Sequence, residues 1–239
     1  MLILSLDTSS PAGSIAVLSD HQLIGVLSTV TEETFSSRIF RQLDFLLSDL
    51  RLTTSSFDLF AVNAGPGSFT GLRVGLTAAK AWAEAFSKPV VAVSGLEAVA
   101  KAASISACEH LVPAMDARRG QLYVGHYRRL QPAGAERQAL ARICEDAVMS
   151  PAEFRNWLSD TPDLSSATVV TPSPSWLLSV LAREDSAPPR QILGISPVLA
   201  PVIGQLALAK SQRGEAVDAL RLDANYVRRS DAELNWKGK

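Results

Sequence analysis

The spacing of apolar positions divides the first hundred residues into strands and helices. Apolar runs bounded by turn residues predict strands, and apolar positions three or four apart predict helices. We expect strands at 2–7, 14–18, 23–29, 59–62 and 90–93, and helices at 31–51, 71–86 and 96–104. This order places helices over a mixed sheet, which is an α/β arrangement.

The first predicted helix carries an apolar stripe along one side. Thr31 is its expected N-cap, and Glu32 and Glu33 fall in its first turn, where the helix dipole favours acidic side chains. Phe40 adds an apolar side chain beside the stripe. The stripe residues recur at helical spacing and are Phe35, Ile39, Leu43, Leu46, Leu47 and Leu50.

A Gly/Pro/Ser loop precedes the second predicted helix. Gly65 and Gly67 flank Pro66, where the chain must reverse sharply. Such a loop before a helix suggests phosphate binding. However, its glycines are one residue too widely spaced for the dinucleotide fingerprint, and no Gly-Lys-Ser/Thr follows. The spacing favours a tight strand-to-helix turn, with Ser68 or Thr70 capping the helix.

Small residues line one side of that second helix. Two glycines inside a helix cost about 1 kcal/mol each relative to alanine, and close approach of another backbone is the usual reason for keeping them. The spacing leaves open whether the neighbour is the chain's own sheet or another protein, with packing inside the chain favoured. The small-residue side comprises Gly71, Gly75, Ala78, Ala79, Trp82 and Ala83.

A second unit begins near residue 107 and resembles the start of the chain. Strand-like runs at 111–116 and 121–128 surround the turn 117–120. Asp7 and Asp116 end corresponding strands, 116 − 7 = 109 residues apart, which indicates a duplicated fold. We therefore expect two domains, at 1–105 and 106–239. The remaining expected elements are strands at 167–171 and 192–195, helices at 151–158, 175–184 and 198–213, a break at Pro188-Pro189 and a polar tail from Asp223.

Composition narrows the class of protein. The chain has 239 residues, 47% of them hydrophobic, so it can bury a substantial core. No apolar run is long enough to span a membrane, and no basic start precedes the first strand, so we expect neither a membrane segment nor a signal peptide. Cys108 and Cys144 are isolated, as suits a reducing cytosol. A net charge of −1 gives no general attraction to nucleic acid.

Four segments closely resemble the TsaB (YeaZ) family, and the resemblance spans the whole chain. The segments read DTSSPAGSIAVL, GPGSFTGLRVGLTAAKAWA, DARRGQLYVGHY and NYVRRSDAE. The resemblance implies two ribonuclease H-like domains of the actin-like ATPase (ASKHA) type. It also implies a cytoplasmic role in making threonylcarbamoyladenosine beside the tRNA anticodon. An older label for the family is glycoprotease-like.

In that family, TsaB is a non-catalytic scaffold and dimerisation subunit. The resemblance implies that it supports transfer of the threonylcarbamoyl group from threonylcarbamoyl-AMP. The implied partners are a TsaD-like catalytic paralogue, a TsaE-like ATPase and, indirectly, tRNA. The sequence leaves open whether the chain without partners is a monomer or a homodimer. No cofactor of its own is implied. The sequence leaves open whether ATP or ADP sits at the junction with the paralogue, whether tRNA touches this chain, and what the polar tail does.

The histidines do not support a metal centre. The catalytic paralogue binds metal through two histidines four apart on its first helix, whereas the matching helix here has Phe35-Ser36. His21, His110 and His126 lie far apart in sequence and are expected in separate roles. We therefore expect no metal site and no catalytic residue, and a metallopeptidase is disfavoured.

A stand-alone ATP-dependent phosphotransferase or ATPase is the alternative. Asp7 and Asp116 would then hold magnesium-bound waters, and the turns 9–13 and 117–120 would cradle phosphates. Nucleotide-binding relatives close the adenosine pocket with a late Gly-Gly turn, which this chain lacks. Asp7 could instead simply cap its own turn.

Two sets of residues are the predicted sites. The two helices 31–51 and 71–86 are expected to dock the paralogue through Phe35, Ile39, Phe40, Leu43, Leu46, Leu47, Leu72, Gly75 and Ala79. The residues expected near a phosphate or another anion are Asp7, Ser9, Asp116, Arg118 and Arg119. A solvated hairpin tip is an equally good interpretation of the two arginines, and Gly120 is expected to need a positive φ.

Overall fold

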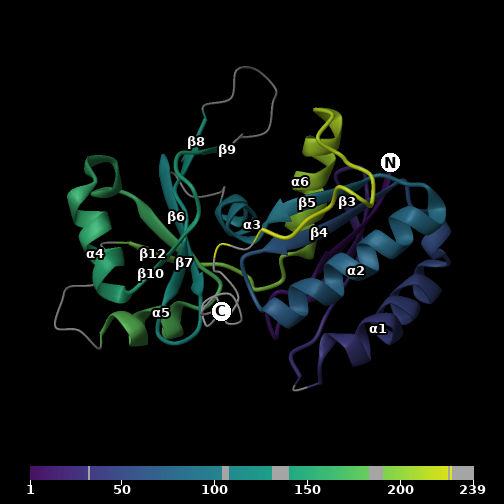
Figure 1. The fold of residues 1–239 in the computed structure, drawn as a ribbon, viewed down its shortest axis with the longest axis horizontal. Helices are drawn as coiled ribbons and strands as arrows, with labels where there is room; N and C mark the ends of the chain where they lie inside the picture. The colour runs from purple at the N-terminus through teal and green to yellow at the C-terminus, as the bar shows by residue number, and fades with distance from the viewer. Residues whose placement is uncertain (32, 104–107, 131–139, 183–190, 226, 228–239) are drawn as a thin grey trace, which may run out of the picture.

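The computed structural model describes residues 1–31, 33–103, 108–130, 140–182, 191–225 and 227. The predictions for Glu32, for Pro188-Pro189 and for most of the tail lie outside these ranges. Two mixed sheets with helices packed around them make up the fold (Figure 1). This is the α/β class that the sequence predicts.

The first sheet has five strands in the order β3-β2-β1-β4-β5. β1 pairs in parallel with β4, and β4 with β5, while β1, β2 and β3 form an antiparallel meander. The strands are β1 (Leu2–Asp7), β2 (Ser14–Ser19), β3 (Gln22–Ser28), β4 (Leu59–Gly65) and β5 (Val90–Ser94).

The second sheet repeats that topology. Its main path runs β10-β7-β6-β11-β12, with β6, β11 and β12 parallel and β7 and β10 antiparallel. β8 and β9 extend it beside β6. The duplication inferred from Asp7 and Asp116 is confirmed, since β1 and β6 occupy the same place in the two sheets. The strands are β6 (His110–Asp116), β7 (Leu122–Val124), β8 (Tyr127–Arg129), β9 (Leu140–Arg142), β10 (Ala147–Met149), β11 (Thr168–Thr171) and β12 (Ile192–Gly194).

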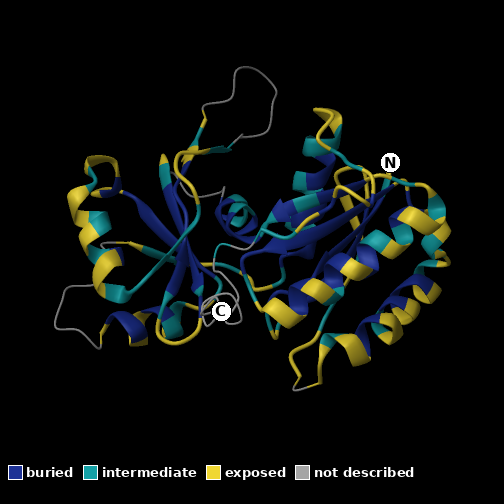
Figure 2. Cartoon of the chain, in the orientation of Figure 1, coloured by how far each residue is buried: buried dark blue, intermediate teal, exposed yellow. Residues whose placement is uncertain are grey.

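Six α-helices are described, and they form three layers around the two sheets (Figure 1). α1 and α2 cover one face of the first sheet, α4 and α5 cover the far face of the second, and α3 and α6 lie between. Figure 2 shows that the central strands β1, β4 and β6 are mostly buried, whereas the edge strand β3 is not, and that α1 and α2 alternate between buried and exposed positions. The helices are α1 (Phe35–Leu50), α2 (Phe69–Phe86), α3 (Gly95–Ala102), α4 (Pro151–Asp160), α5 (Pro174–Leu181) and α6 (Ala200–Gln212), with short 3₁₀ turns at Thr54–Ser56 and Pro162–Leu164.

In the middle layer, α6 packs against strands that lie far from it in the chain. α6 follows the second sheet in the chain but packs on β1, β2, β4 and β5 of the first. The carbonyl of Ala200 accepts a hydrogen bond from Ser5 Oγ at 2.7 Å, and a Cβ on Gly204 would lie 2.4 Å from Leu18 Cδ1. The strands of the first sheet lie within residues 2–94 and those of the second within residues 110–194, and α6 belongs by its contacts to the first sheet.

Several element boundaries differ from the predictions by a few residues, and two of the differences have a local explanation. The run 121–128 is two strands rather than one, because Gly125 donates to the Pro113 carbonyl and the chain crosses from β7 to β8 there. α1 begins at Phe35, with Thr34 rather than Thr31 as N-cap, and has no acid in its first turn.

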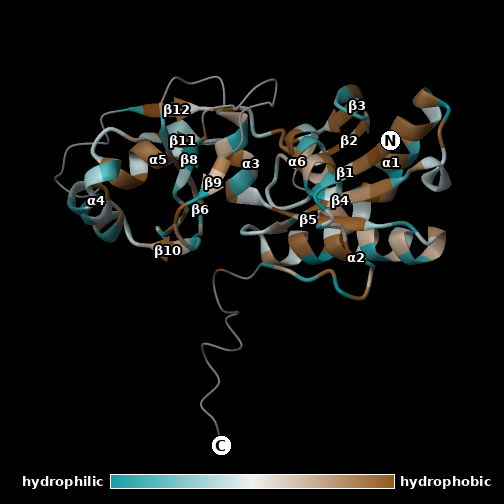
Figure 3. Ribbon diagram, turned by 90° about the horizontal axis from the view of Figure 1, so that it is seen from above, coloured by the Kyte–Doolittle hydropathy of each residue, from teal (hydrophilic) through white to brown (hydrophobic). Residues whose placement is uncertain are grey.

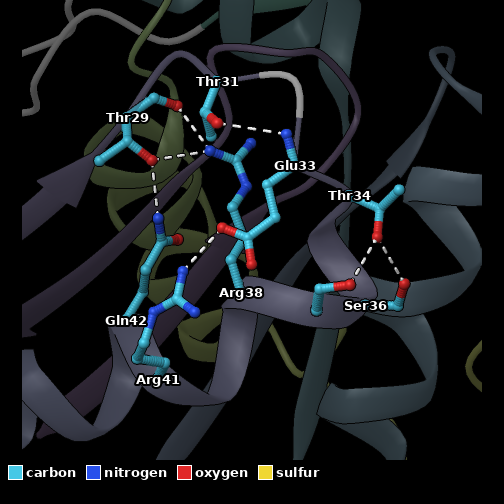
Figure 4. Close-up of polar contacts among 9 residues, drawn as sticks. Thr29, Thr31, Glu33, Thr34, Ser36, Arg38, Arg41 and Gln42 are labelled. Atoms are coloured by element: carbon cyan, nitrogen blue, oxygen red, sulfur yellow. Dashed lines mark hydrogen bonds and ion pairs between the residues drawn. The ribbon is translucent and has the colours of Figure 1, made fainter.

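Local hydrogen bonds explain the late start of α1 (Figure 4). Thr31 Oγ1 accepts from the Glu33 backbone N–H at 3.2 Å, which stabilises a turn in place of a helical one. The Glu33 carboxylate then pairs with Arg41 at 2.7 Å. No helix in the described ranges is long and apolar enough to cross a membrane.

Candidate functional site

An apolar groove of about 460 Å³ runs between α1 and α2. Phe40 from α1 and Phe69 from the start of α2 are 61% and 39% exposed. Phe40 meets the edge of Trp82 with ring centroids 6.4 Å apart. Figure 3 shows hydrophobic residues recurring along α2. The groove is therefore an apolar surface that the fold leaves uncovered.

Most of the predicted docking residues lie elsewhere. Ile39, Leu43, Leu46 and Leu47 are at most 7% exposed and pack into the core under α1. Leu72, Gly75 and Ala79 are likewise buried on the sheet side of α2, and Phe35 is half-buried beneath the Arg38 guanidinium. Of the predicted set, Phe40 is the residue that lines the groove.

The groove-lining residues that the sequence reasoning missed have their own periodicity. Thr70, Val74, Thr77 and Ala81 of α2 recur at helical spacing and line the groove. They form a second, weaker apolar stripe on the side of α2 away from the glycines. Phe45, which is 68% exposed on α1, also lies off the main stripe but does not line the groove.

A larger cleft of about 800 Å³ lies between the two halves of the molecule. The first half contributes Ser9, the loop before α2 and the first turns of α2, and the second half contributes the turn 117–120 and the start of α5. Among its charged lining residues are Arg73, Arg118, Arg119 and Asp116. The structure thus brings four of the five predicted anion-site residues to one cavity, the fifth, Asp7, being absent from its lining.

The turn after β1 and the turn after β6 each donate a backbone hydrogen bond to the aspartate at the end of the preceding strand. Asp7 Oδ1 accepts from the Ser9 backbone N–H at 3.0 Å, and Asp116 Oδ1 accepts from the Arg118 backbone N–H at 2.7 Å. Both carboxylates therefore cap the turn that follows their strand. Gly120 has a φ of 72°, as predicted, and Arg118 and Arg119 also adopt positive φ values of 65° and 55°.

Asp7 is sealed beneath its turn. It is 1% exposed, and its Oδ1 also accepts from Ser9 Oγ and Asn63 Nδ2 at 2.7 and 3.0 Å. Its Oδ2 has no hydrogen-bond partner among the described residues. Burial raises the pKa of this carboxyl, and the bonds from Ser9 and Asn63 oppose the rise. The interpretation of Asp7 as a turn cap therefore describes its contacts better than the interpretation as a cleft ligand.

A buried arginine, Arg38, connects α1 with the turn 9–13, and Figure 4 shows its bonds to Thr29. Arg38 is 1% exposed, donates to the Thr29 carbonyl and hydroxyl at 2.8 and 2.7 Å, and donates to the Pro11 carbonyl at 3.1 Å. Its guanidinium stacks on Phe35 at 3.9 Å. Burial lowers its pKa, and the charge of Glu33 opposes that shift. The helix beside the groove and the turn beside the cleft are thus held together.

Asp146 connects the two halves and the C-terminal segment. Its carboxylate accepts from Ser94, Tyr127 and Asn225 at 3.2, 3.4 and 3.4 Å. Burial raises the pKa of Asp146, whereas the bond from Ser94 lowers it. Asn225 also donates its backbone N–H to the Ala64 carbonyl at 2.7 Å, so the segment after α6 is tied to β4.

Two histidines that the sequence treats as separate form a pair. His110 Nδ1 and His126 Nε2 lie 2.9 Å apart, and His126 meets the edge of Trp157. Burial lowers the pKa of His126, the neighbouring His110 lowers it further, and Asp163 opposes both. Within the described ranges, no group of three or more His, Cys, Asp or Glu residues is placed to hold a metal ion.

Two mixed sheets of the same topology, with a cleft between them, define an α/β protein of duplicated fold. A family model described as "TsaD: tRNA N6-adenosine threonylcarbamoyltransferase" matches residues 14–165. The chain is 29% identical over 237 residues to the tRNA threonylcarbamoyladenosine biosynthesis protein TsaB of Bacillus subtilis, covering 99% of this chain and 98% of that one. The TsaB of Haemophilus influenzae is 28% identical over 240 residues, covering 99% and 96%.

Solved structures agree with the sequence comparisons. YeaZ from Pseudomonas aeruginosa superposes with a TM-score of 0.73 at 26% identity, covering 94% of this chain and 99% of that one. A second Pseudomonas aeruginosa structure, titled as similar to peptidase YEAZ, gives 0.75 at 26% identity, covering 95% and 99%. The chain belongs to the TsaB (YeaZ) family.

Proposed function

We propose that this chain is a non-catalytic subunit of the machinery that makes tRNA threonylcarbamoyladenosine in the cytoplasm, and that it docks a TsaD-type catalytic paralogue through the α1–α2 groove. The names of its full-length relatives support the process. The uncovered groove is the observation that supports docking. In this role the chain supports transfer of the threonylcarbamoyl group from threonylcarbamoyl-AMP but does not itself react.

The chemistry of the groove suits a helical partner. Phe40 and Phe69 are large apolar side chains held on rigid helices, and aromatic anchors of this kind dominate many interfaces. Burying apolar surface stabilises a complex by about 25 cal/mol per Å². A helix that enters the groove would pack about 8–10 Å from α1 and α2. The paralogue, which shares the family model, would supply its equivalent helices.

Pull-down and titration with the purified paralogue test the docking surface. Phe40→Glu places a charge in the apolar groove and should weaken binding about 30-fold, since burying an unpaired carboxylate is costly. Phe45→Glu is the matched control, because Phe45 lies on the same helix, is at least as exposed and lines neither cavity. We expect binding by this control to stay within about threefold of the wild type.

Both variants must first be shown to fold, by circular dichroism and a cooperative urea transition. Leu43→Glu is unsuitable as a docking test, because Leu43 is 5% exposed and its substitution would damage the core. If folded Phe40→Glu binds the paralogue as the wild type does, the groove is not the docking surface.

The same groove would accept a second copy when the paralogue is absent. An isologous dimer would bury Phe40 and Phe69 of both copies. Sedimentation of the free chain should then show a dimer that the paralogue dissociates. A TsaE-like ATPase and, indirectly, tRNA complete the proposed set of partners.

The cleft favours a second role, which is to hold ATP or ADP at the junction with the paralogue. Its arginines suit phosphate, and Tyr123 and Trp176 offer aromatic faces for a base.

Two assays separate the subunit role from a stand-alone ATPase. One is reconstituted tRNA modification with and without this chain, and the other is an ATPase assay on the chain alone. Modification that needs the mixture supports the subunit role, whereas steady ATP turnover by the purified chain supports a stand-alone ATPase.

A further inference from the structure

The segment that follows α6 returns to the first sheet and ends beside the second half of the molecule. Val217 pairs with Val90 at the edge of β5, and Leu222, which is 2% exposed, packs into the core under α1 and α2. The backbone N–H of Asn225 then donates to the Ala64 carbonyl at 2.7 Å. The segment therefore reaches the cleft at Asn225, which is one of its lining residues.

The backbone of Asn225 is fixed to the first half. Its carbonyl oxygen would lie 2.5 Å from a Cβ on Gly65, which has a φ of 118°. Glycine suits this position, because a side chain would be strained at such a φ and would have no room. The short bond to Ala64 and this close approach hold the backbone of Asn225 in one place, whatever its side chain contacts.

The side chain of Asn225 crosses to the second half. Its Nδ2 donates to Asp146 Oδ2 at 3.4 Å, and Ser94 Oγ donates to the same oxygen at 3.2 Å. Ser94 ends β5 and is the N-cap of α3, so two donors attached to the first half meet one carboxylate of the second. The other oxygen, Asp146 Oδ1, accepts from Tyr127 at 3.4 Å within the second half.

The bonds to Asp146 are the weaker part of this connection. Hydrogen bonds to a carboxylate are commonly about 2.7–2.9 Å long, and the three bonds here are longer. The two halves also share an apolar core that includes Met115 and Tyr123, which line the cleft as well. If the bonds to Asp146 break, Asn225 stays with the first half, and the halves can turn about the shared core.

We infer that Asn225 and Asp146 form a clasp between the two halves, which sets how far the cleft opens. With the clasp closed, the cleft has its volume of about 800 Å³; with the clasp open, the halves separate and the cleft widens. This inference goes beyond the proposed docking function and does not depend on it. It gives the segment after α6 a part in controlling access to the cleft.

Small-angle X-ray scattering of the whole chain, recorded on the monomer peak of a size-exclusion column, tests the clasp. Asn225→Asp places a second carboxylate against Asp146, and like charges in contact repel each other. We expect the radius of gyration to rise by about 1 Å above the roughly 18 Å of a compact chain of this length. Asn156→Asp, the same exchange at an exposed position of α4, should leave the radius unchanged.

Exchanging the two residues with each other is the decisive variant. Asn225→Asp combined with Asp146→Asn again pairs a carboxylate with an amide, so the wild-type radius should return. A cooperative urea transition shows that each variant is folded. If Asn225→Asp does not fold, Asn225→Ala takes its place, since it removes the amide without adding a charge and should also enlarge the radius.

Two outcomes overturn the clasp. One is a folded Asn225→Asp or Asn225→Ala chain with the radius of the wild type, and the other is a double exchange that stays as expanded as Asn225→Asp alone. Neither outcome affects the docking proposal, because Asn225 and Asp146 do not line the groove. Conversely, docking that is unaffected by Phe40→Glu overturns the docking surface and leaves the clasp standing.

Discussion

Asp7 illustrates what the sequence can and cannot say about a single residue. The repeat with Asp116 predicts its place at the end of the first strand, and the structure confirms that place. Its hydrogen bond from Asn63 joins residues 56 positions apart, which only the fold brings together. The two aspartates therefore occupy equivalent positions but different environments, and Asp116 alone lines the cleft.

The buried carboxyl of Asp7 should make stability depend on pH. Because burial raises its pKa, the folded state holds the proton more tightly than the unfolded state does. The raised pKa of Asp7 stabilises the folded state fully at pH values below the ordinary pKa of an aspartate. This stabilisation is lost as the pH rises through the raised pKa. Relative to Asp7→Asn, the wild type should lose up to about 1.4 kcal/mol per pH unit across that window. Urea unfolding of both proteins at a series of pH values measures this difference.

Asp49→Asn is the control for that series. Asp49 is exposed on α1, so its substitution should change the unfolding free energy by less than about 0.5 kcal/mol throughout. A constant difference between the wild type and Asp7→Asn from pH 4 to pH 8 would show that the carboxyl ionises equally in both states.

At the scale of elements, periodicity predicts helices well but does not distinguish core from interface. The α1 stripe that includes Ile39 and Leu43 reads as a docking face, yet it packs on the chain's own sheet. The residues that line the groove, such as Phe40 and Val74, lie off the main stripes of α1 and α2. A single sequence shows that they depart from the stripes, but not that they face an uncovered surface. The predicted start of α1 is also wrong, because Thr31 and Glu33 form a local hydrogen bond that helix propensity does not reveal.

The glycine side of α2 packs closely against the chain itself and not against another protein. A Cβ at Gly75 would lie 2.4 Å from Thr8 Oγ1, and one at Gly71 would meet the Thr8 carbonyl oxygen. Gly71→Ala gains about 1 kcal/mol of helix propensity but should lose more by overpacking, for a net loss of about 2 kcal/mol. Urea unfolding measures the balance.

Ala85→Gly isolates the propensity contribution in the same helix. Ala85 is exposed near the end of α2, so this change should cost about 1 kcal/mol through helix propensity alone. Stabilisation by Gly71→Ala would mean that Thr8 moves aside freely and that the small-residue side is not closely packed.

For the whole molecule, the duplication is visible in the sequence, but the packing of α6 on the first sheet is not. α3 and α6 follow equivalent strands, β5 and β12, and both lie between the sheets. The contacts of α6 with β1 and β2 join residues nearly 200 positions apart; Ser5 bonds to Ala200 across a separation of 195. Local periodicity carries no information over such a distance, so the sequence alone does not show that α6 packs on the first sheet.

The packing of α6 on the first sheet predicts how the molecule responds to being cut between the two sheets. The fragment 1–105 would leave the inner face of the first sheet uncovered, including Ile3, Leu18 and Ala61, which α6 and the rest of the middle core now bury. It would also leave Ser5 and Ser14 without their bonds to Ala200. Uncovered apolar surface of this kind should make the fragment aggregate or remain a loosely packed state.

Co-expression with the fragment 106–239 should restore a soluble complex, because α6 returns with it. We expect the complex to unfold cooperatively in urea, and the fragment 1–105 alone to show no cooperative transition. The matched variant is Ile203→Ala in the uncut chain, which removes a side chain that is 0% exposed and should cost 2–5 kcal/mol. A cooperative transition from the fragment 1–105 alone would mean that the first sheet is stable without α6 and that the boundary read from the sequence is the physical one.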